Sequence, residues 1–286
     1  MTGKEIIAKV KDLNLPEGSY VVFGSCPLAL AGIRESNDID LLVNSAVSNR
    51  LKSAGWKQIS KGPKDKPFVK DDFEAHSNWN FSSYKPTLTK LLKTATIIEN
   101  IPFASLDEVR KWKESSGRSK DLKDIKLIDK YYSLPTITIC SSASFYRQAV
   151  DVQAQLQKLD YRVIIPATAE KMKHSGDFNV QHYKTWFGNK NDYHKKTALM
   201  RGHFDEVKKG DAILVLNYEK HDIKNYIGGN ALMEMALAFF LHKPIFILNE
   251  IPENSNFLEE IIGLNPVLLH GKVEALPREY ENVLTT

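Results

Sequence analysis

The alternation of hydrophobic and polar positions is clearest between residues 211 and 249. Two short apolar runs, 211–217 and 243–249, are rich in branched and aromatic residues. Runs of this length without alternation are typical of strands buried on both faces of a sheet. Between them, 231–240 is apolar on nearly every side and has the length of a crossover helix. The pattern therefore predicts a βαβ unit.

One charged residue, Glu234, interrupts this apolar helix. A carboxylate beside Met233 and Met235 is costly to bury unless something pairs with it. Gly228 and Gly229 precede the helix in a loop at the carboxyl end of a strand, where open α/β sheets bind ligands. We interpret Glu234 as the working carboxylate of a cleft. The alternative is a glutamate that complements the helix dipole or caps its own backbone.

A second pattern lies in the first 45 residues. An apolar run over 19–23 predicts a strand and is followed by Gly24 and Ser25. Alternation over 38–43 then puts Asp38 and Asp40 on one face of a strand, with apolar residues on the other. Two adjacent carboxylates repel each other unless a cation lies between them. A simple turn before the strand is the alternative, but it does not explain Asp40 within an apolar run.

The remaining periodicity predicts two domains, 1–133 and 134–286. Residues 86–131 have mostly helical spacing, with a short extended link at 97–103 and a capping box that begins at Ser105. Strands at 136–140 and 161–165 flank a helix in the second domain. Residues 167–200 have little periodicity, and a long insertion of this kind is commonly a lid over a ligand site. Its histidines lack the spacing of a metal site.

Composition narrows the class of protein. The 286 residues are 42% hydrophobic and 26% charged, which is typical of a globular protein with room for two cores. A formal net charge of +4, carried by dispersed lysines and arginines, does not indicate nucleic-acid binding. Cys26 and Cys140 are the only cysteines, which favours free thiols in a reducing compartment. With no apolar run long enough for a bilayer, we expect a cytoplasmic protein without membrane contact.

The C-terminal half, over roughly residues 135–270, resembles the nucleoside 2-deoxyribosyltransferase family and its relatives, the 2'-deoxynucleoside 5'-phosphate N-hydrolases. Three elements carry the resemblance: the small-residue loop in 139–145, the acidic helix that runs into an Asp211-led strand, and the Gly-containing loop before Glu234. The resemblance implies an α/β fold with a doubly wound parallel sheet of the flavodoxin or Rossmann type. It also implies that this domain needs no cofactor, and that the protein is a homo-oligomer.

This resemblance assigns roles to individual residues. Glu234 would attack the anomeric carbon of a nucleoside or nucleotide and displace the base, and water or a second base would resolve the covalent intermediate. Asp205 would contact the base or the ribose, with His203 as its rival. The expected substrate-binding residues are Ser142, Ser144, Tyr146, Arg201, Gly228, Gly229 and Asn230. Ser144 stands where the hydrolases carry an arginine, so a 5'-phosphate needs another partner, such as Arg201.

The N-terminal half resembles the minimal nucleotidyltransferase superfamily through its Gly24-Ser25 turn and its Asp38-x-Asp40 strand. The resemblance implies an α+β domain that binds a nucleotide through Gly24, Ser25 and Lys120. Asp38, Asp40 and Glu74 would bind Mg²⁺, which bridges phosphates. Asp71 and Asp72 are alternatives to Glu74. The charges at 118–124, which include Lys120, could also form a solvated helix face.

The two resemblances together predict a nucleotide-processing enzyme. Its C-terminal domain would cleave or transfer an N-glycosidic bond, fused to a nucleotidyltransferase-like domain. One alternative is a Mg²⁺-dependent nucleotidyltransferase whose C-terminal domain only recognises nucleotides. A second alternative is a non-catalytic nucleotide sensor built from both folds.

Overall fold

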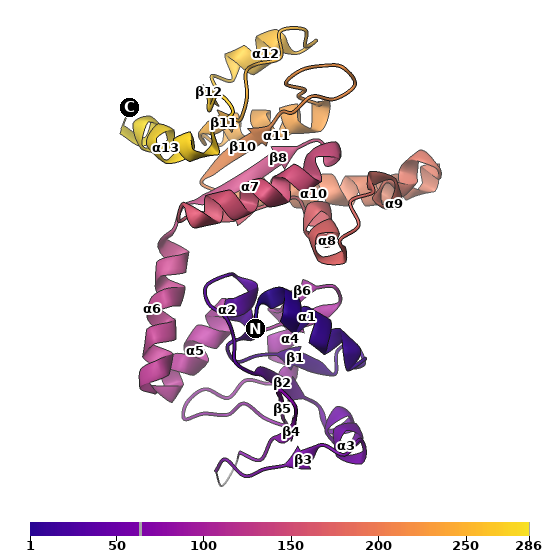
Figure 1. Ribbon diagram of the computed structural model, residues 1–286, viewed down its shortest axis with the longest axis vertical. Coiled ribbons are helices and arrows are strands. Elements are labelled where there is room, and N and C mark those ends of the chain that lie inside the picture. Colours follow the sequence, from indigo (N-terminus) through magenta and orange to yellow (C-terminus); the bar gives the residue numbers. More distant parts are fainter. Residues whose placement is uncertain (63–64, 286) are drawn as a thin grey trace. The chain divides into compact units, whose positions relative to one another are not determined.

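The computed structural model describes residues 1–62 and 65–285. The chain divides into two compact units, Met1–Ser133 and Leu134–Thr286. Both units are mixed α/β, one with a mixed sheet and the other with an all-parallel sheet (Figure 1).

The N-terminal unit is built on seven strands in the order β3-β4-β5-β2-β1-β7-β6. The strands are β1 (Tyr20–Val22), β2 (Ile39–Val43), β3 (Lys57–Gln58), β4 (Phe68–Lys70), β5 (Phe73–His76), β6 (Thr96–Ile98) and β7 (Ile101–Phe103). The helices are α1 (Gly3–Asp12), α2 (Cys26–Leu30), α3 (Ser45–Ser53), α4 (Leu88–Lys93), α5 (Leu106–Ser116) and α6 (Ser119–Ser133).

Side-chain alternation in β1 and β2 divides the core of this unit into two clusters. Val22 and Leu41 pack with α1 and α3 on one face, whereas Val21 and Leu42 pack with α5 and α6 on the other. Strands β2 and β5 pair in parallel with Asp40 opposite Glu74. The third carboxylate expected from the sequence therefore lies on the strand next to Asp40.

The region 86–131 departs from a purely helical pattern. The stretch expected as an extended link is an antiparallel β6–β7 hairpin, and β7 pairs in parallel with β1. The Ser105 hydroxyl accepts a hydrogen bond from the backbone N–H of Glu108 at 3.3 Å. The Glu108 carboxylate instead accepts from the Tyr84 hydroxyl at 2.8 Å and from Lys111 at 2.8 Å. The predicted capping box is thus half formed.

The C-terminal unit has five parallel strands in the order β12-β11-β10-β8-β9. The strands are β8 (Thr136–Ser141), β9 (Arg162–Ile164), β10 (Ala212–Leu216), β11 (Ile245–Ile247) and β12 (Val267–Leu268). The α-helices are α7 (Tyr146–Lys158), α8 (Ala167–Ser175), α9 (Val180–Tyr183), α10 (Tyr193–Lys209), α11 (Gly229–Phe240), α12 (Leu258–Gly263) and α13 (Leu276–Thr285). Short 3₁₀ turns are η1 (Ala143–Phe145), η2 (Thr185–Phe187), η3 (Lys190–Asp192) and η4 (Val273–Ala275).

The predicted βαβ unit is confirmed. Strands β10 and β11 are parallel neighbours, and α11 connects them. Helices cover both faces of the sheet, with α7, α8 and α13 in one hydrophobic cluster and α10, α11 and α12 in the other. Strand order reverses between β8 and β10, so the loops after these two strands flank an opening at their carboxyl ends.

Two further expectations concern the insertion at 167–200 and membrane contact. The stretch 167–200 is more regular than its sequence indicated, because it contains α8, α9 and the beginning of α10. Within the described part of the chain, no helix combines the length and the apolar character needed to cross a membrane.

Candidate functional site

A cavity of about 490 Å³ opens at the carboxyl ends of β8 and β10. Its walls come from the loop after β8, from 166–206, from the loop after β10 and from the start of α11. The polar residues among its walls include Ser141, Ser142, Lys184, Lys196, His203, Glu206, Lys220, Asn230 and Glu234. Its volume lies within the range of small-molecule sites in proteins.

Glu234 lies in the second turn of α11, and its residue exposure is 7%. Gly228 is the N-cap of this helix, and no side chain caps it. Glu234 Oε2 has no hydrogen-bond partner among the described residues. Glu234 is therefore not the backbone cap that the simpler interpretation required, and it is a buried carboxylate at the wall of the cavity.

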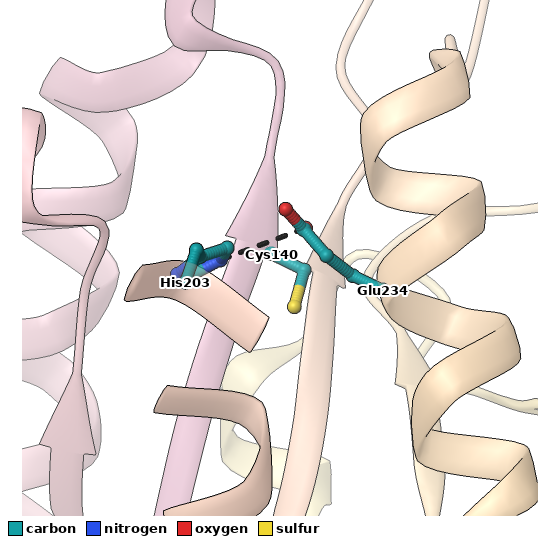
Figure 2. A group of neighbouring side chains, drawn as sticks. All are labelled: Cys140, His203 and Glu234. Carbon is teal, nitrogen blue, oxygen red and sulfur yellow. Dashed lines mark ion pairs between the residues drawn. The ribbon is translucent and has the colours of Figure 1, made fainter. Parts of the chain in front are cut away.

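His203 on α10 lies between two carboxylates. Its Nδ1–H donates to Glu206 Oε2 at 2.5 Å, and its Nε2 lies 3.5 Å from Glu234 Oε2. Figure 2 shows His203 and Glu234 facing each other across the end of β8. Burial lowers the pKa of His203, but Cys140, Glu206 and Glu234 outweigh it and hold this pKa above its usual value. The imidazolium form is therefore favoured at neutral pH.

Cys140, near the end of β8, completes this group (Figure 2). Its Sγ and the nearest ligand atoms of His203 and Glu234 all lie within 4.8 Å of one another. The cysteine is buried and forms no disulfide. Burial, and secondarily the charge of Glu234, raise the pKa of the Cys140 thiol to about 12, so the thiol is protonated near neutral pH.

Three lysines give the cavity a positive charge. Lys196 donates to Asn230 Oδ1 at 3.1 Å, and Lys220 donates to Ser142 Oγ at 3.0 Å. Burial lowers the pKa of all three, and for Lys184 the charges of Lys220 and Lys196 add to the effect. A partly buried cluster of like charges favours an anionic ligand.

The residues expected at this site separate into two groups. Those that line the cavity are Ser142, Tyr146, His203, Gly228, Gly229, Asn230 and Glu234. Arg201 and Asp205 are exposed and lie outside the lining, and Asp205 pairs with Lys208 at 3.5 Å. The reason is helical geometry, because a displacement of two residues from the inward-facing His203 rotates a side chain about 200° around α10. Ser144 borders a neighbouring cavity instead.

Several residues of this site were missed in the sequence. Glu206 could have been found, because it lies three residues after His203 on one helical face. Cys140 and the three lysines carried no such local signal, since they come from separate loops and elements.

The N-terminal unit contains a second cavity, of about 480 Å³. It is lined by Ser25, Asp38, Asp40, Glu74 and Lys120, all expected from the sequence. Gly24 is not part of the cavity lining, but its backbone packs against the Asp40 side chain. The φ angle of Gly24 is +63°, and a Cβ atom there would lie 1.9 Å from Asp40 Oδ2.

The compact group of possible metal ligands in this cavity is Asp40, Glu74 and His76, with ligand atoms within 4.8 Å of one another. His76 Nε2 lies 3.6 Å from one carboxylate oxygen of each acid and is buried, with no hydrogen-bond partner among residues 1–62 and 65–285. Asp38 lines the same cavity but does not belong to the group, so His76 takes the place expected for it. Burial, and then the charges of Asp40 and Glu74, raise the pKa of Asp38.

The two carboxylates are ligands that suit Mg²⁺ or Mn²⁺, whereas an imidazole nitrogen more often binds zinc, copper, iron or nickel. In the described structure Lys61 neutralises part of the charge, because its Nζ lies 2.5 Å from both Glu74 oxygens. Further cations line the cavity wall at Arg34 and Arg118. The cavity thus combines an acidic group with a basic rim.

The acidic residues after Lys120 form buried ion pairs. Asp121 is 0% exposed, accepts from Arg118 Nε at 2.6 Å and lies 3.2 Å from Lys113 Nζ. Asp124 lies 2.7 Å from the same lysine and accepts two hydrogen bonds of 2.6 Å from Arg34. The interpretation of 118–124 as a solvated helix face is therefore wrong for these two aspartates.

Comparison of the sequence with protein-family models and with curated proteins gives no match. The resemblances to the deoxyribosyltransferase and nucleotidyltransferase families therefore stay predictions.

Proposed function

We propose that the C-terminal unit cleaves or transfers the N-glycosidic bond of a nucleoside or nucleotide, on a sheet of the flavodoxin or Rossmann type. The observation that carries this proposal is the buried Glu234 carboxylate at the wall of a 490 Å³ cavity, with one oxygen that accepts no hydrogen bond from the described residues. Buried carboxylate oxygens without a hydrogen bond are costly, and such groups cluster at functional sites.

The chemistry follows from the position of His203. His203 Nε2 lies 3.5 Å from Glu234 Oε2 and pairs with the carboxylate that acts as the nucleophile. One oxygen of Glu234 forms a bond to the anomeric carbon, and the C–N bond breaks so that its electron pair leaves with the base. Water or a second base then attacks the same carbon and releases Glu234. Covalent catalysis thereby divides one difficult displacement into two steps.

The rest of the cavity suits such a substrate. Tyr146, Trp186 and Tyr226 offer aromatic rings on which a base can stack. The three lysines described above can neutralise a 5'-phosphate, the role that the sequence gave to Arg201. We therefore prefer a 5'-nucleotide to a nucleoside as substrate.

The test is release of free base. The full-length protein, freed of metals with a chelator, is incubated with a panel of nucleosides and 5'-nucleotides, and the products are separated by chromatography. Glu234→Gln should abolish base release, whereas Glu259→Gln, an exposed glutamate of the same unit on α12, should keep it. The proposal fails if no compound releases base, or if Glu234→Gln is as fast as the unmodified protein.

A second candidate function, nucleotidyl transfer, has its own support in the N-terminal unit. Asp40 and Glu74 face each other across paired strands, beside a buried His76 nitrogen that has no hydrogen bond within the described part of the chain. We propose a nucleotidyltransferase-like α+β domain in which Asp40, Glu74 and His76 hold the divalent cation and Ser25 and Lys120 contact the nucleotide. When bound, the cation would neutralise phosphate charge.

This second function is tested with labelled nucleoside triphosphates and Mn²⁺ or Mg²⁺. Transfer of label to any acceptor should disappear in Asp40→Asn and persist in Asp12→Asn, an exposed aspartate of α1. Nucleotide binding with no turnover at either site, undiminished by Glu234→Gln and Asp40→Asn, would instead favour a non-catalytic sensor.

A further inference from the structure

We propose that Cys140, His203 and Glu234 form a binding site for a thiophilic divalent cation, with zinc as the preferred ion, at the inner wall of the C-terminal cavity. The proposal is independent of the glycosidic chemistry proposed above. It concerns a ligand that neither family resemblance implies. Three features of the group support it.

The first feature is the spacing of the donor atoms. Zinc bonds of about 2.0–2.2 Å to nitrogen and oxygen, arranged tetrahedrally, separate the two donors by about 3.4 Å. His203 Nε2 and Glu234 Oε2 are 3.5 Å apart. This separation is too long for a normal hydrogen bond but matches two ligands of one ion.

The second feature is that these donors have no other partner. Both His203 Nε2 and Glu234 Oε2 are buried and lack a hydrogen bond within the described chain. Their side chains are 10% and 9% exposed. Buried polar atoms in native proteins are nearly always satisfied, so two adjacent atoms that both lack a hydrogen bond point to a ligand between them.

The third feature is a hydrogen bond at the other ring nitrogen of His203. Glu206 accepts a hydrogen bond from His203 Nδ1–H at 2.5 Å, which leaves Nε2 as the nitrogen that faces Glu234 and Cys140. A carboxylate behind a ligating histidine is the usual arrangement in zinc proteins, where it fixes the tautomer and raises the basicity of the ligand.

The donor types select the ion. A cysteine sulfur beside an imidazole favours zinc over magnesium or calcium, which prefer oxygen ligands. Binding converts the Cys140 thiol to a thiolate and removes the Nε2 proton of His203, and both protons pass to solvent. His203 and Glu234 line the cavity, so a fourth coordination position on that side is open to a small molecule.

Zinc binding and glycosidic chemistry would exclude each other in this cavity. The Glu234 oxygen that would attack a sugar is the oxygen nearest the bound ion. Zinc would therefore block any chemistry that needs a free Glu234, and a chelator would restore it.

Cobalt(II) provides a direct test, because thiolate coordination to cobalt gives a near-ultraviolet charge-transfer band that oxygen and nitrogen ligands do not give. The reduced, metal-free, full-length protein is titrated with Co²⁺ without oxygen. We expect a band that saturates during the titration and collapses when Zn²⁺ is added. The band should be absent in Cys140→Ser and unchanged in Cys26→Ser, since Cys26 is the chain's other buried thiol and lies in the N-terminal unit.

A second variant covers the case in which Cys140→Ser does not fold, which circular dichroism would reveal. Glu206→Gln keeps all three ligands and should weaken cobalt binding roughly 10- to 100-fold. No charge-transfer band in the unmodified protein, a band that survives in folded Cys140→Ser, or an affinity unchanged by Glu206→Gln would overturn the proposal. Base release by metal-free protein is measured separately, so failure of either proposal leaves the other to its own test.

Discussion

Gly24 and Asp40 are in contact so close that only glycine fits: a Cβ atom on residue 24 would lie 1.9 Å from Asp40 Oδ2. Gly24 also has a φ angle of +63°, a conformation that costs a residue with a side chain about 1 kcal/mol. The turn after β1 therefore packs directly against the Asp40 carboxylate on β2. This contact explains why a glycine precedes Ser25 in structural terms, whatever the cavity binds.

Substitution of Gly24 should therefore cost more than backbone strain. Gly24→Ala should lower the free energy of unfolding by about 2–4 kcal/mol, because strain and overpacking add. Gly18→Ala is the matched control, with a φ angle of +72° and nothing within 4 Å of the added Cβ, and should cost only about 1 kcal/mol. Urea unfolding followed by tryptophan fluorescence measures both. Equal costs would show that the Asp40 contact adjusts freely.

The lysines of the C-terminal cavity predict a preference for phosphorylated substrates. Lys220→Ala should raise KM for a 5'-nucleotide roughly 10- to 100-fold, because a charged hydrogen bond contributes about 1.5–3 kcal/mol. KM for the matching nucleoside should change little. Lys224→Ala removes an exposed lysine of the same loop and should affect neither. Steady-state kinetics on both substrates measures these KM values. An equal rise in KM for nucleoside and nucleotide would contradict a role of Lys220 in phosphate binding.

Acid should destabilise the N-terminal unit through Asp121 and Asp124. Burial raises the pKa of each, but hydrogen bonds from Arg118 and Arg34, together with Lys113, outweigh it and lower the pKa below 3.8. Because the pKa is lower in the folded state, the stabilisation is present above about pH 3.8 and is lost as the pH falls below it.

The measurement is urea unfolding between pH 7 and pH 3. In Asp124→Asn, part of the loss of stability at low pH should disappear, and the variant should already be less stable at pH 7, because it leaves buried positive charge incompletely paired. Asp107→Asn, an exposed aspartate of α5, should follow the unmodified protein at every pH. An identical pH dependence of stability in all three proteins would show that Asp124 does not contribute to the acid sensitivity.

Both thiols should be unreactive in the native protein. Cys26 and Cys140 are buried, and burial raises the pKa of each to about 12, so little thiolate is present at pH 8. Ellman's reagent should detect no thiol in native, metal-free protein and two thiols after unfolding. Rapid labelling of one native cysteine would show that its surroundings open readily.

Much of the fold follows from local periodicity. The apolar runs on either side of 231–240 are parallel neighbours in the sheet, as their pattern predicted. The β6–β7 hairpin was harder to predict, because its strands have three residues each and Ile97 is 59% exposed. Short strands of this kind depend on pairing with the sheet rather than on their own sequence.

The sequence by itself determined which short segments are candidate sites: alternation placed Asp38 and Asp40 on one strand face, and the break in an apolar helix singled out Glu234. Only the tertiary structure decided which distant residues meet them. It joined His76 to Asp40 and Glu74, turned His203 inward instead of Asp205, and brought Cys140 from β8 to the histidine and glutamate. The physical reason is the sequence separation of the contacts. Periodicity reflects residues that are neighbours within one helical turn or one strand, whereas the packing of helices on a sheet brings together residues far apart in the chain.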